Sequence, residues 1–122
     1  MRTTGSIIET IPKGSSVGAL SVPTTTGTDT SIYVLWQDTT GNIQVNWVSN
    51  SSSSWVGPST YDALKNADNG TSITCLTPVT WYNVSIGTGP SLGRCYFQVN
   101  SAVREVEVDG GEWKVLGDLP IP

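Results

Sequence analysis

The chain lacks histidine and has few charged residues. None of its 122 residues is His, only 13% are charged, and the formal net charge is -4. Histidine is the commonest general base and the commonest metal ligand, so its absence argues against acid–base catalysis and against a metal site. There is no block of Lys or Arg, which argues against nucleic acid and anionic membrane surfaces as partners. We expect no cofactor.

Long apolar runs are also missing. The N-terminal segment MRTTGSIIET has no apolar run long enough for a signal peptide, and no segment of the chain is long and apolar enough for a transmembrane helix. We therefore expect a chain that is made without a secretory signal or is already processed, either cytoplasmic or released by another route, and not inserted in a membrane.

Cysteine is scarce. Cys75 and Cys95 are too few to build a disulfide-based fold. The two residues fall on the first and second predicted strands of one repeat, so they could form one bridge if directly opposed, or remain two buried thiols.

The apolar segments of the chain are rich in strand-forming residues. Val, Ile, Thr and aromatic residues dominate the apolar segments, separated by Ser, Thr, Asn, 13 Gly and 7 Pro. This composition favours strands and turns, and the length suffices for a domain with a modest core. The sequence therefore predicts an all-β fold.

The chain contains an internal repeat. GSSVGALSV, from Gly14, resembles GTSITCLTP, from Gly70, and SIYVLWQDTTGNIQVNWV at 31–48 resembles GRCYFQVNSAVREVEVDG at 93–110. Further along, the segment from Trp55 resembles the segment from Trp113. The similar segments follow the same order in both halves, so the chain divides into an N-terminal arm (1–13), a first repeat (14–66) and a second repeat (67–122).

Each repeat is predicted to hold four short antiparallel strands. The expected ranges are about 16–22, 31–37, 42–48 and 54–58 in the first repeat, and 71–77, 93–99, 101–108 and 112–117 in the second. Such a unit is typical of one β-propeller blade. Two blades cannot close a ring, so the remaining blades would come from other copies of the chain, with the arm adding an edge strand to a neighbour. The alternative is a β-sandwich with pseudo-symmetric halves.

The second repeat resembles a known family. Arg94-Cys-Tyr96-Phe-Gln98, then Val103-Arg-Glu105, then Trp113 with Gly117, is similar to the blade pattern of the fungal fucose-specific lectins. Small bacterial relatives of that family carry two blades and form a trimeric six-bladed propeller. The resemblance implies that Arg94 and Glu105 hydrogen-bond a sugar and that a Trp or Tyr, often from the adjacent blade, stacks on it. It therefore predicts a homotrimeric, non-catalytic lectin that binds fucosylated glycans.

The first repeat departs from this pattern, because Tyr33 and Val45 occupy the Arg and Glu positions. The first repeat would then bind nothing or supply only an aromatic wall. The candidate aromatic contacts are Trp55, Trp113, Trp81 and Trp47, with Trp81 in the long segment before Arg94.

The residue types suit a sugar on physical grounds. Arg offers a rigid fork of donors, Glu offers acceptors for hydroxyl groups, and indole offers a flat apolar face for the C–H patch of the ring.

Two other interpretations of these residues remain. Arg94 and Glu105 could form a simple surface ion pair, in a structural or protein-interaction domain without sugar binding. Glu105 and Glu107 are poor candidates for glycoside hydrolysis, because no apolar neighbour would raise one pKa in so open a strand. We expect no enzymatic activity.

Overall fold

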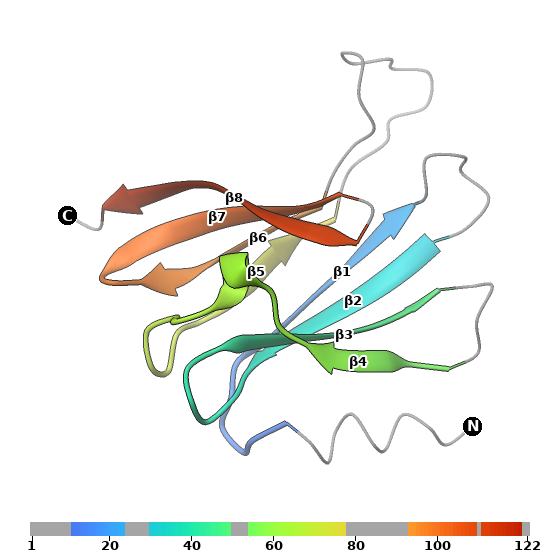
Figure 1. Ribbon diagram of the computed structural model, residues 1–122, viewed down its shortest axis with the longest axis horizontal. Coiled ribbons are helices and arrows are strands. Elements are labelled where there is room, and N and C mark those ends of the chain that lie inside the picture. Colours follow the sequence, from blue (N-terminus) through green and yellow to red (C-terminus); the bar gives the residue numbers. More distant parts are fainter. Residues whose placement is uncertain (1–10, 24–29, 50–53, 78–92, 110, 121–122) are drawn as a thin grey trace.

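The computed structural model describes residues 11–23, 30–49, 54–77, 93–109 and 111–120. Most of the N-terminal arm and the segment that holds Trp81 lie outside these ranges. The described residues form two four-stranded antiparallel sheets, each a simple meander, with strand orders β1-β2-β3-β4 and β5-β6-β7-β8 (Figure 1). Within these residues no helix is long and apolar enough to cross a membrane.

The strands lie close to their predicted positions. The first sheet consists of β1 (Val17–Pro23), β2 (Thr30–Gln37), β3 (Ile43–Ser49) and β4 (Val56–Ser59). The second consists of β5 (Thr74–Leu76), β6 (Gly93–Val99), β7 (Ala102–Asp109) and β8 (Glu112–Pro120). A short 3₁₀ turn, η1 (Asp62–Leu64), joins the sheets. The all-β prediction with four antiparallel strands in each repeat is confirmed; β5 is shorter than expected, and β8 is longer.

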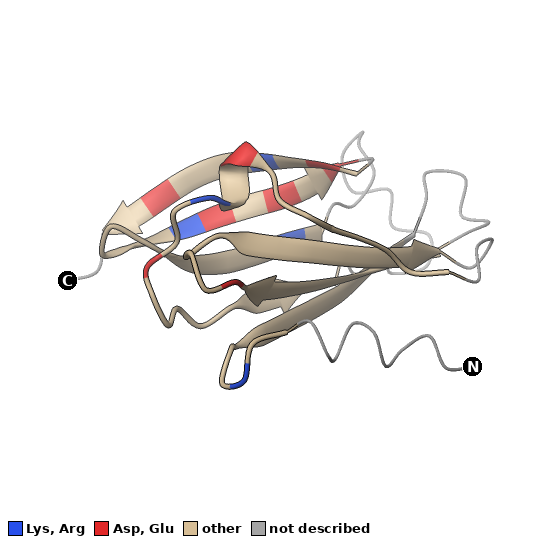
Figure 2. Cartoon of the chain, turned by 60° about the horizontal axis from the view of Figure 1, so that its bottom comes forward, with Lys and Arg blue, Asp and Glu red and all other residues tan. Residues whose placement is uncertain are grey.

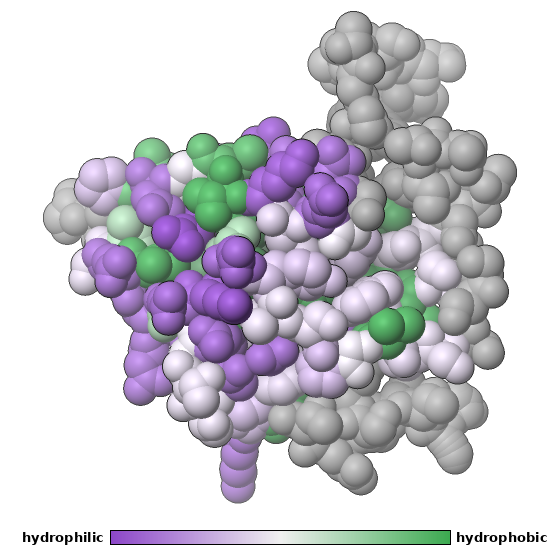
Figure 3. Space-filling view, viewed as in Figure 1, coloured by the Kyte–Doolittle hydropathy of each residue, from purple (hydrophilic) through white to green (hydrophobic). Residues whose placement is uncertain are grey.

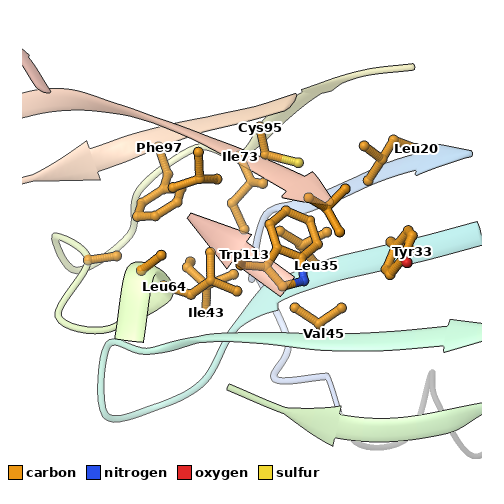
Figure 4. Close-up of a cluster of buried hydrophobic side chains, with 14 of the residues drawn as sticks. Leu20, Tyr33, Leu35, Ile43, Val45, Leu64, Ile73, Cys95, Phe97 and Trp113 are labelled. Atoms are coloured by element: carbon orange, nitrogen blue, oxygen red, sulfur yellow. The ribbon is translucent and has the colours of Figure 1, made fainter. Parts of the chain in front are cut away.

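The two sheets share one hydrophobic core. Successive strand residues point to opposite faces, and in both sheets one face is apolar and packs against the other sheet. The aromatic ring of Trp113 lies between the sheets, near Leu35, with Leu64 from η1 close by (Figure 4). The largest fully buried side chains are Phe97, Leu35, Ile43, Leu64, Val45, Val106 and Val108. The surface seen in Figure 3 is mostly polar or neutral, with apolar side chains in separate small groups.

The repeat seen in the sequence is present in the strand register. Leu35 faces Val45 across β2 and β3, and Tyr96 faces Glu105 across β6 and β7. The register between the last two strands shifts next to Val45 in the first sheet and next to Glu105 in the second. The structurally equivalent pairs are Leu20 and Leu76, Tyr33 and Arg94, Gln37 and Gln98, Val45 and Glu105, and Trp55 and Trp113.

Hydrogen bonds at the start of each repeat confirm this alignment. Ser15 Oγ accepts a hydrogen bond from the N–H of Gln37 at 3.1 Å, and Thr71 Oγ1 accepts one from the N–H of Gln98 at 2.8 Å. Each hydroxyl also donates to the carbonyl of the next residue in the chain. The two repeats therefore share the strand register and this hydroxyl-mediated contact.

The two faces in contact are not equivalent faces of this unit. The first sheet packs through Leu20, Tyr33 and Leu35, all buried, whereas their equivalents in the second sheet, Leu76, Arg94 and Tyr96, point away from the core. A pseudo-two-fold arrangement would bring equivalent faces together. We call the face that carries Leu20 in the first sheet or Leu76 in the second sheet the back face, and the opposite face the front face. In these terms, the back face of the first sheet packs on the front face of the second.

A disulfide joins β5 to β6. Cys75 and Cys95 face each other directly in the register and are bonded, so neither is a free thiol. Cys95 is fully buried in the core. The bridge ties the three-residue strand β5 to the longer β6, beside the β1 strand on which both pack.

Candidate functional site

Three polar side chains meet on the back face of the second sheet. Arg94 and Tyr96 lie two residues apart on β6 and therefore point to the same side, and Glu105 lies opposite Tyr96 on β7. Glu105 Oε2 accepts hydrogen bonds from Arg94 Nη1 at 3.0 Å and from the Tyr96 hydroxyl at 2.8 Å. We call these three residues the Arg94 cluster.

The Arg94 cluster is accessible from solvent. The side chain of Arg94 is 48% exposed and that of Glu105 is 24% exposed, so a ligand can reach both. The hydrogen bond to Glu105, together with burial and the negative charge of that carboxylate, raises the pKa of Tyr96. Tyr96 therefore remains a neutral donor at physiological pH and orients the Glu105 carboxylate.

Charge is concentrated on this sheet. Figure 2 shows the basic and acidic residues mostly along β6, β7 and β8, while the strands of the first sheet carry almost none. Glu107 and Asp109 follow Glu105 on the same side of β7, as alternation requires. Among the described strands the charged side chains therefore lie in the second sheet, and several of them are on its back face.

The geometry leaves hydrogen-bonding capacity free for a ligand. Both contacts to Glu105 use Oε2, and in the described part of the chain Oε1 has no hydrogen-bond partner. Arg94 contributes one of its five N–H donors to the pair. A polyol with neighbouring hydroxyls could donate to Glu105 and accept from Arg94 at the same time.

Trp113 does not join the Arg94 cluster. It lies on the front face of the second sheet, where it is only 7% exposed, and it packs edge-on against Tyr33 with ring centroids 5.7 Å apart. Its indole N–H is buried and has no hydrogen-bond partner among the described residues. The predicted role of Trp113 as a ligand contact is therefore not supported by its position, which is that of a core residue.

Trp47 and Trp55 are not part of the hydrogen-bonded Arg94 cluster either. Trp47 lies on the back face of the first sheet and packs against the core. Trp55 immediately precedes β4, outside the strand, and is half-buried. Trp81 lies outside the described residues. Within the described residues, a single chain therefore provides the polar groups of the predicted site, but no tryptophan that could stack on a sugar there.

Two features of this sheet were absent from the predicted site. Tyr96 belongs to the motif that carries the family resemblance, and its spacing from Arg94 was the signal that it shares the same face. Arg104 and Asp118 form a second ion pair across β7 and β8, with contacts of 2.9 and 3.2 Å. The hydrogen bonds from Arg104 lower the pKa of Asp118. This pair lies on the front side of the sheet, away from the Arg94 cluster.

In the residues described, no group of three or more His, Cys, Asp or Glu side chains is placed to hold a metal ion.

Comparison with family models, with curated proteins and with solved structures finds no match to this chain.

Proposed function

We propose that the protein is a carbohydrate-binding lectin that recognises L-fucose or fucosylated glycans through Arg94 and Glu105, without catalysis. The observation that supports it is the pairing of an accessible guanidinium with an accessible carboxylate, oriented by Tyr96, on an open sheet face. Vicinal hydroxyls of a monosaccharide fit such a pair of donor and acceptor groups.

The proposed architecture is a six-bladed propeller in which each chain provides two blades and three chains close the ring. The front-to-back packing of the two sheets supports it, because blades of a propeller pack in this way around the ring. A β-sandwich of the same two sheets is the alternative, and the mass of the protein in solution separates the two.

A glycan array is the direct test of the function. We expect binding to fucosylated glycans that free L-fucose abolishes, and no binding to glycans without fucose. Retention of the signal in saturating L-fucose, or preference for an unrelated sugar, would contradict the proposal.

The second candidate is a structural or protein-interaction domain without sugar binding. The observation that favours it is that Arg94 and Glu105 already satisfy each other as an ion pair. Exposed pairs of this kind contribute about 0.2 to 1 kcal/mol to stability and need no ligand to explain them. A silent array would support this candidate.

A further inference from the structure

The turn at 68–71 lies where the two repeats meet. Gln37, the last residue of β2, reaches it from the first repeat: its Oε1 accepts a hydrogen bond from the N–H of Gly70 at 3.0 Å, and its Nε2 donates to the carbonyl of Asp68 at 3.0 Å. Gln37 is only 6% exposed, so its side chain is shielded from water. A buried side chain of the first repeat therefore holds the main chain of this turn.

The same turn contains the one Asn-Gly dipeptide of the sequence, Asn69-Gly70, and both residues are exposed. Asparagine loses its side-chain amide most readily in this dipeptide. The backbone nitrogen of the glycine attacks Cγ of the asparagine, a C–N bond forms as ammonia leaves, and water then opens the resulting succinimide to aspartate or isoaspartate. Glycine permits this ring closure because it has no side chain to obstruct the approach. The turn therefore carries the groups for a reaction that needs water and no enzyme.

We infer that Asn69 is a site of spontaneous deamidation, with water as the co-reactant, and that the hydrogen bond from Gly70 to Gln37 keeps the reaction slow in the folded protein. The nitrogen that must attack is the one whose N–H Gln37 accepts. To attack, this nitrogen has to lose its proton and turn toward the side chain of Asn69, and either change breaks the hydrogen bond. Gln37 thus acts as a positioning residue on the reacting atom.

The backbone of the turn opposes the reaction as well. The N–H of Thr71 donates to the carbonyl of Asp68 at 3.0 Å, the φ of Gly70 is +77°, and the φ of Asn69 is negative. These features define a type II turn, in which ψ of the second residue is about +120°. Closure of the five-membered ring requires the nitrogen of Gly70 to eclipse Cβ of Asn69, which this ψ does not allow. Asn69 must therefore rotate out of the turn, and break its hydrogen bonds, before it can react.

The first repeat shows that this turn does not need an asparagine. In its equivalent turn the N–H of Ser15 donates to the carbonyl of Pro12 at 3.1 Å, and the φ of Gly14 is +87°. Lys13 stands there in place of Asn69. Both turns keep the glycine that a positive φ favours, but only the second places an asparagine before it. Asn69→Lys is therefore a control that removes the reacting amide and keeps the turn.

The reaction would alter the joint between the repeats. Isoaspartate adds one carbon to the main chain, because the chain then continues through Cγ, and the turn could not keep its hydrogen bonds. Asp68 would move with it. The carboxylate of Asp68 accepts hydrogen bonds from the N–H groups of Asn100 and Ser101, at 2.7 and 2.9 Å, in the turn between β6 and β7. Deamidation of Asn69 would therefore loosen this turn of the second sheet as well.

Peptide mapping by mass spectrometry tests the inference on the unchanged protein. We expect Asn69 to stay intact in the folded protein at mildly basic pH, and to be converted to aspartate and isoaspartate in protein unfolded with urea at the same pH. The Asn69→Lys variant should lack this conversion in both states, which assigns the signal to Asn69. Equal rates in the folded and unfolded protein, or no conversion in either, would overturn the inference.

A Gln37→Met variant tests the part played by Gln37. The substitution removes the acceptor of the Gly70 N–H, so deamidation in the folded variant should be roughly two- to tenfold faster, the rate equivalent of one hydrogen bond. Thr77→Val is the matched control, because it removes another hydrogen bond between the repeats, which Ser21 N–H donates at 3.2 Å, and leaves Gly70 unchanged. The free energy of unfolding of each variant gives the conversion that passes through global unfolding, and only the excess counts. An excess no larger than that of Thr77→Val would contradict the role of Gln37.

Hydrogen exchange at the Gly70 amide is a second measurement that needs no variant. Because Gln37 accepts this N–H, the amide should be protected although Gly70 is exposed. Urea below the unfolding midpoint should accelerate exchange at Gly70 and conversion of Asn69 by the same factor, since one local opening permits both. An unprotected Gly70 amide, or exchange that accelerates without deamidation, would refute the inference. None of these measurements involves a sugar, so their outcomes are independent of the proposed function.

Discussion

At the scale of single residues, Glu105 is the centre of the candidate site. Its Oε2 atom holds Arg94 and Tyr96 together, so one carboxylate fixes the position of a cation and of a hydroxyl. The pair of Arg94 and Glu105 is partly exposed, and such a pair contributes little to stability.

Replacing Arg94 by Ala distinguishes a role of this residue in sugar binding from a role in the stability of the fold. Hydrogen bonds to charged groups are worth about 1.5 to 3 kcal/mol, so Arg94→Ala should weaken L-fucose binding tenfold or more, while the melting temperature moves little. Glu107→Gln is the control, because Glu107 lies opposite Arg94 in the register and is not part of the Arg94 cluster. A large drop in melting temperature with unchanged glycan affinity would show that the pair is structural.

Asp38 gives a pH dependence that does not involve the site. Burial raises the pKa of Asp38, but hydrogen bonds from Gln44, Thr40 and Asn42 outweigh it, so the pKa is lowered overall. A carboxylate with a lowered folded-state pKa stabilises the fold above its unfolded value, about 3.9, and this stabilisation is lost as the pH falls through the folded value.

Urea unfolding between about pH 6 and pH 2 measures this effect. The free energy of unfolding should fall with acidification, and Asp38→Asn should make the fall shallower. The substitution should not abolish the pH dependence, because the hydrogen bonds that Asp118 accepts from Arg104 lower the pKa of Asp118 as well. Identical pH profiles for Asp38→Asn and the unchanged protein would show that the loop hydrogen bonds are unimportant.

At the scale of elements, the β2–β3 and β6–β7 hairpins are equivalent, but the back face is buried in the first and exposed in the second. Tyr33 and Val45, which replace the Arg and Glu of the second repeat, are 8% and 0% exposed in the shared core. Their equivalents, Arg94 and Glu105, lie on the uncovered face. Burial in the shared core therefore explains why uncharged residues occupy these two positions of the first repeat.

The double variant Tyr33→Arg with Val45→Glu tests this interpretation. It restores the motif in sequence, but it places two charges in a dry core, and burial of charge without compensation costs several kcal/mol. We expect a strongly destabilised protein with no added sugar-binding capacity, measured by chemical unfolding and by binding stoichiometry. A stable double variant that binds twice as much sugar would show that the first repeat can form a site within the chain.

The sequence predicted the elements better than the site. Turn residues and alternating apolar residues fixed the eight strands closely, since both signals are local. The disulfide was left open, because it depends on whether Cys75 and Cys95 face each other, which only the register decides. Trp113 illustrates the remaining difficulty: an aromatic residue in a binding motif and one in a core look alike in sequence, and only the face of the strand distinguishes them.

At the scale of the whole molecule, the two sheets pack through non-equivalent faces of the repeated unit. The second sheet covers the back face of the first sheet, and the back face of the second sheet carries the exposed side chains of Leu76 and Leu119. The candidate site lies on this back face of the second sheet.

Calorimetric titration of L-fucose into the protein tests the central claim most directly. Only the second repeat has an accessible Arg and Glu pair, so the account predicts saturable binding with one site for each chain. Arg94→Ala should abolish or greatly weaken that binding, and Glu107→Gln should preserve it. The absence of any binding by the folded protein, or two sites for each chain, would contradict the account.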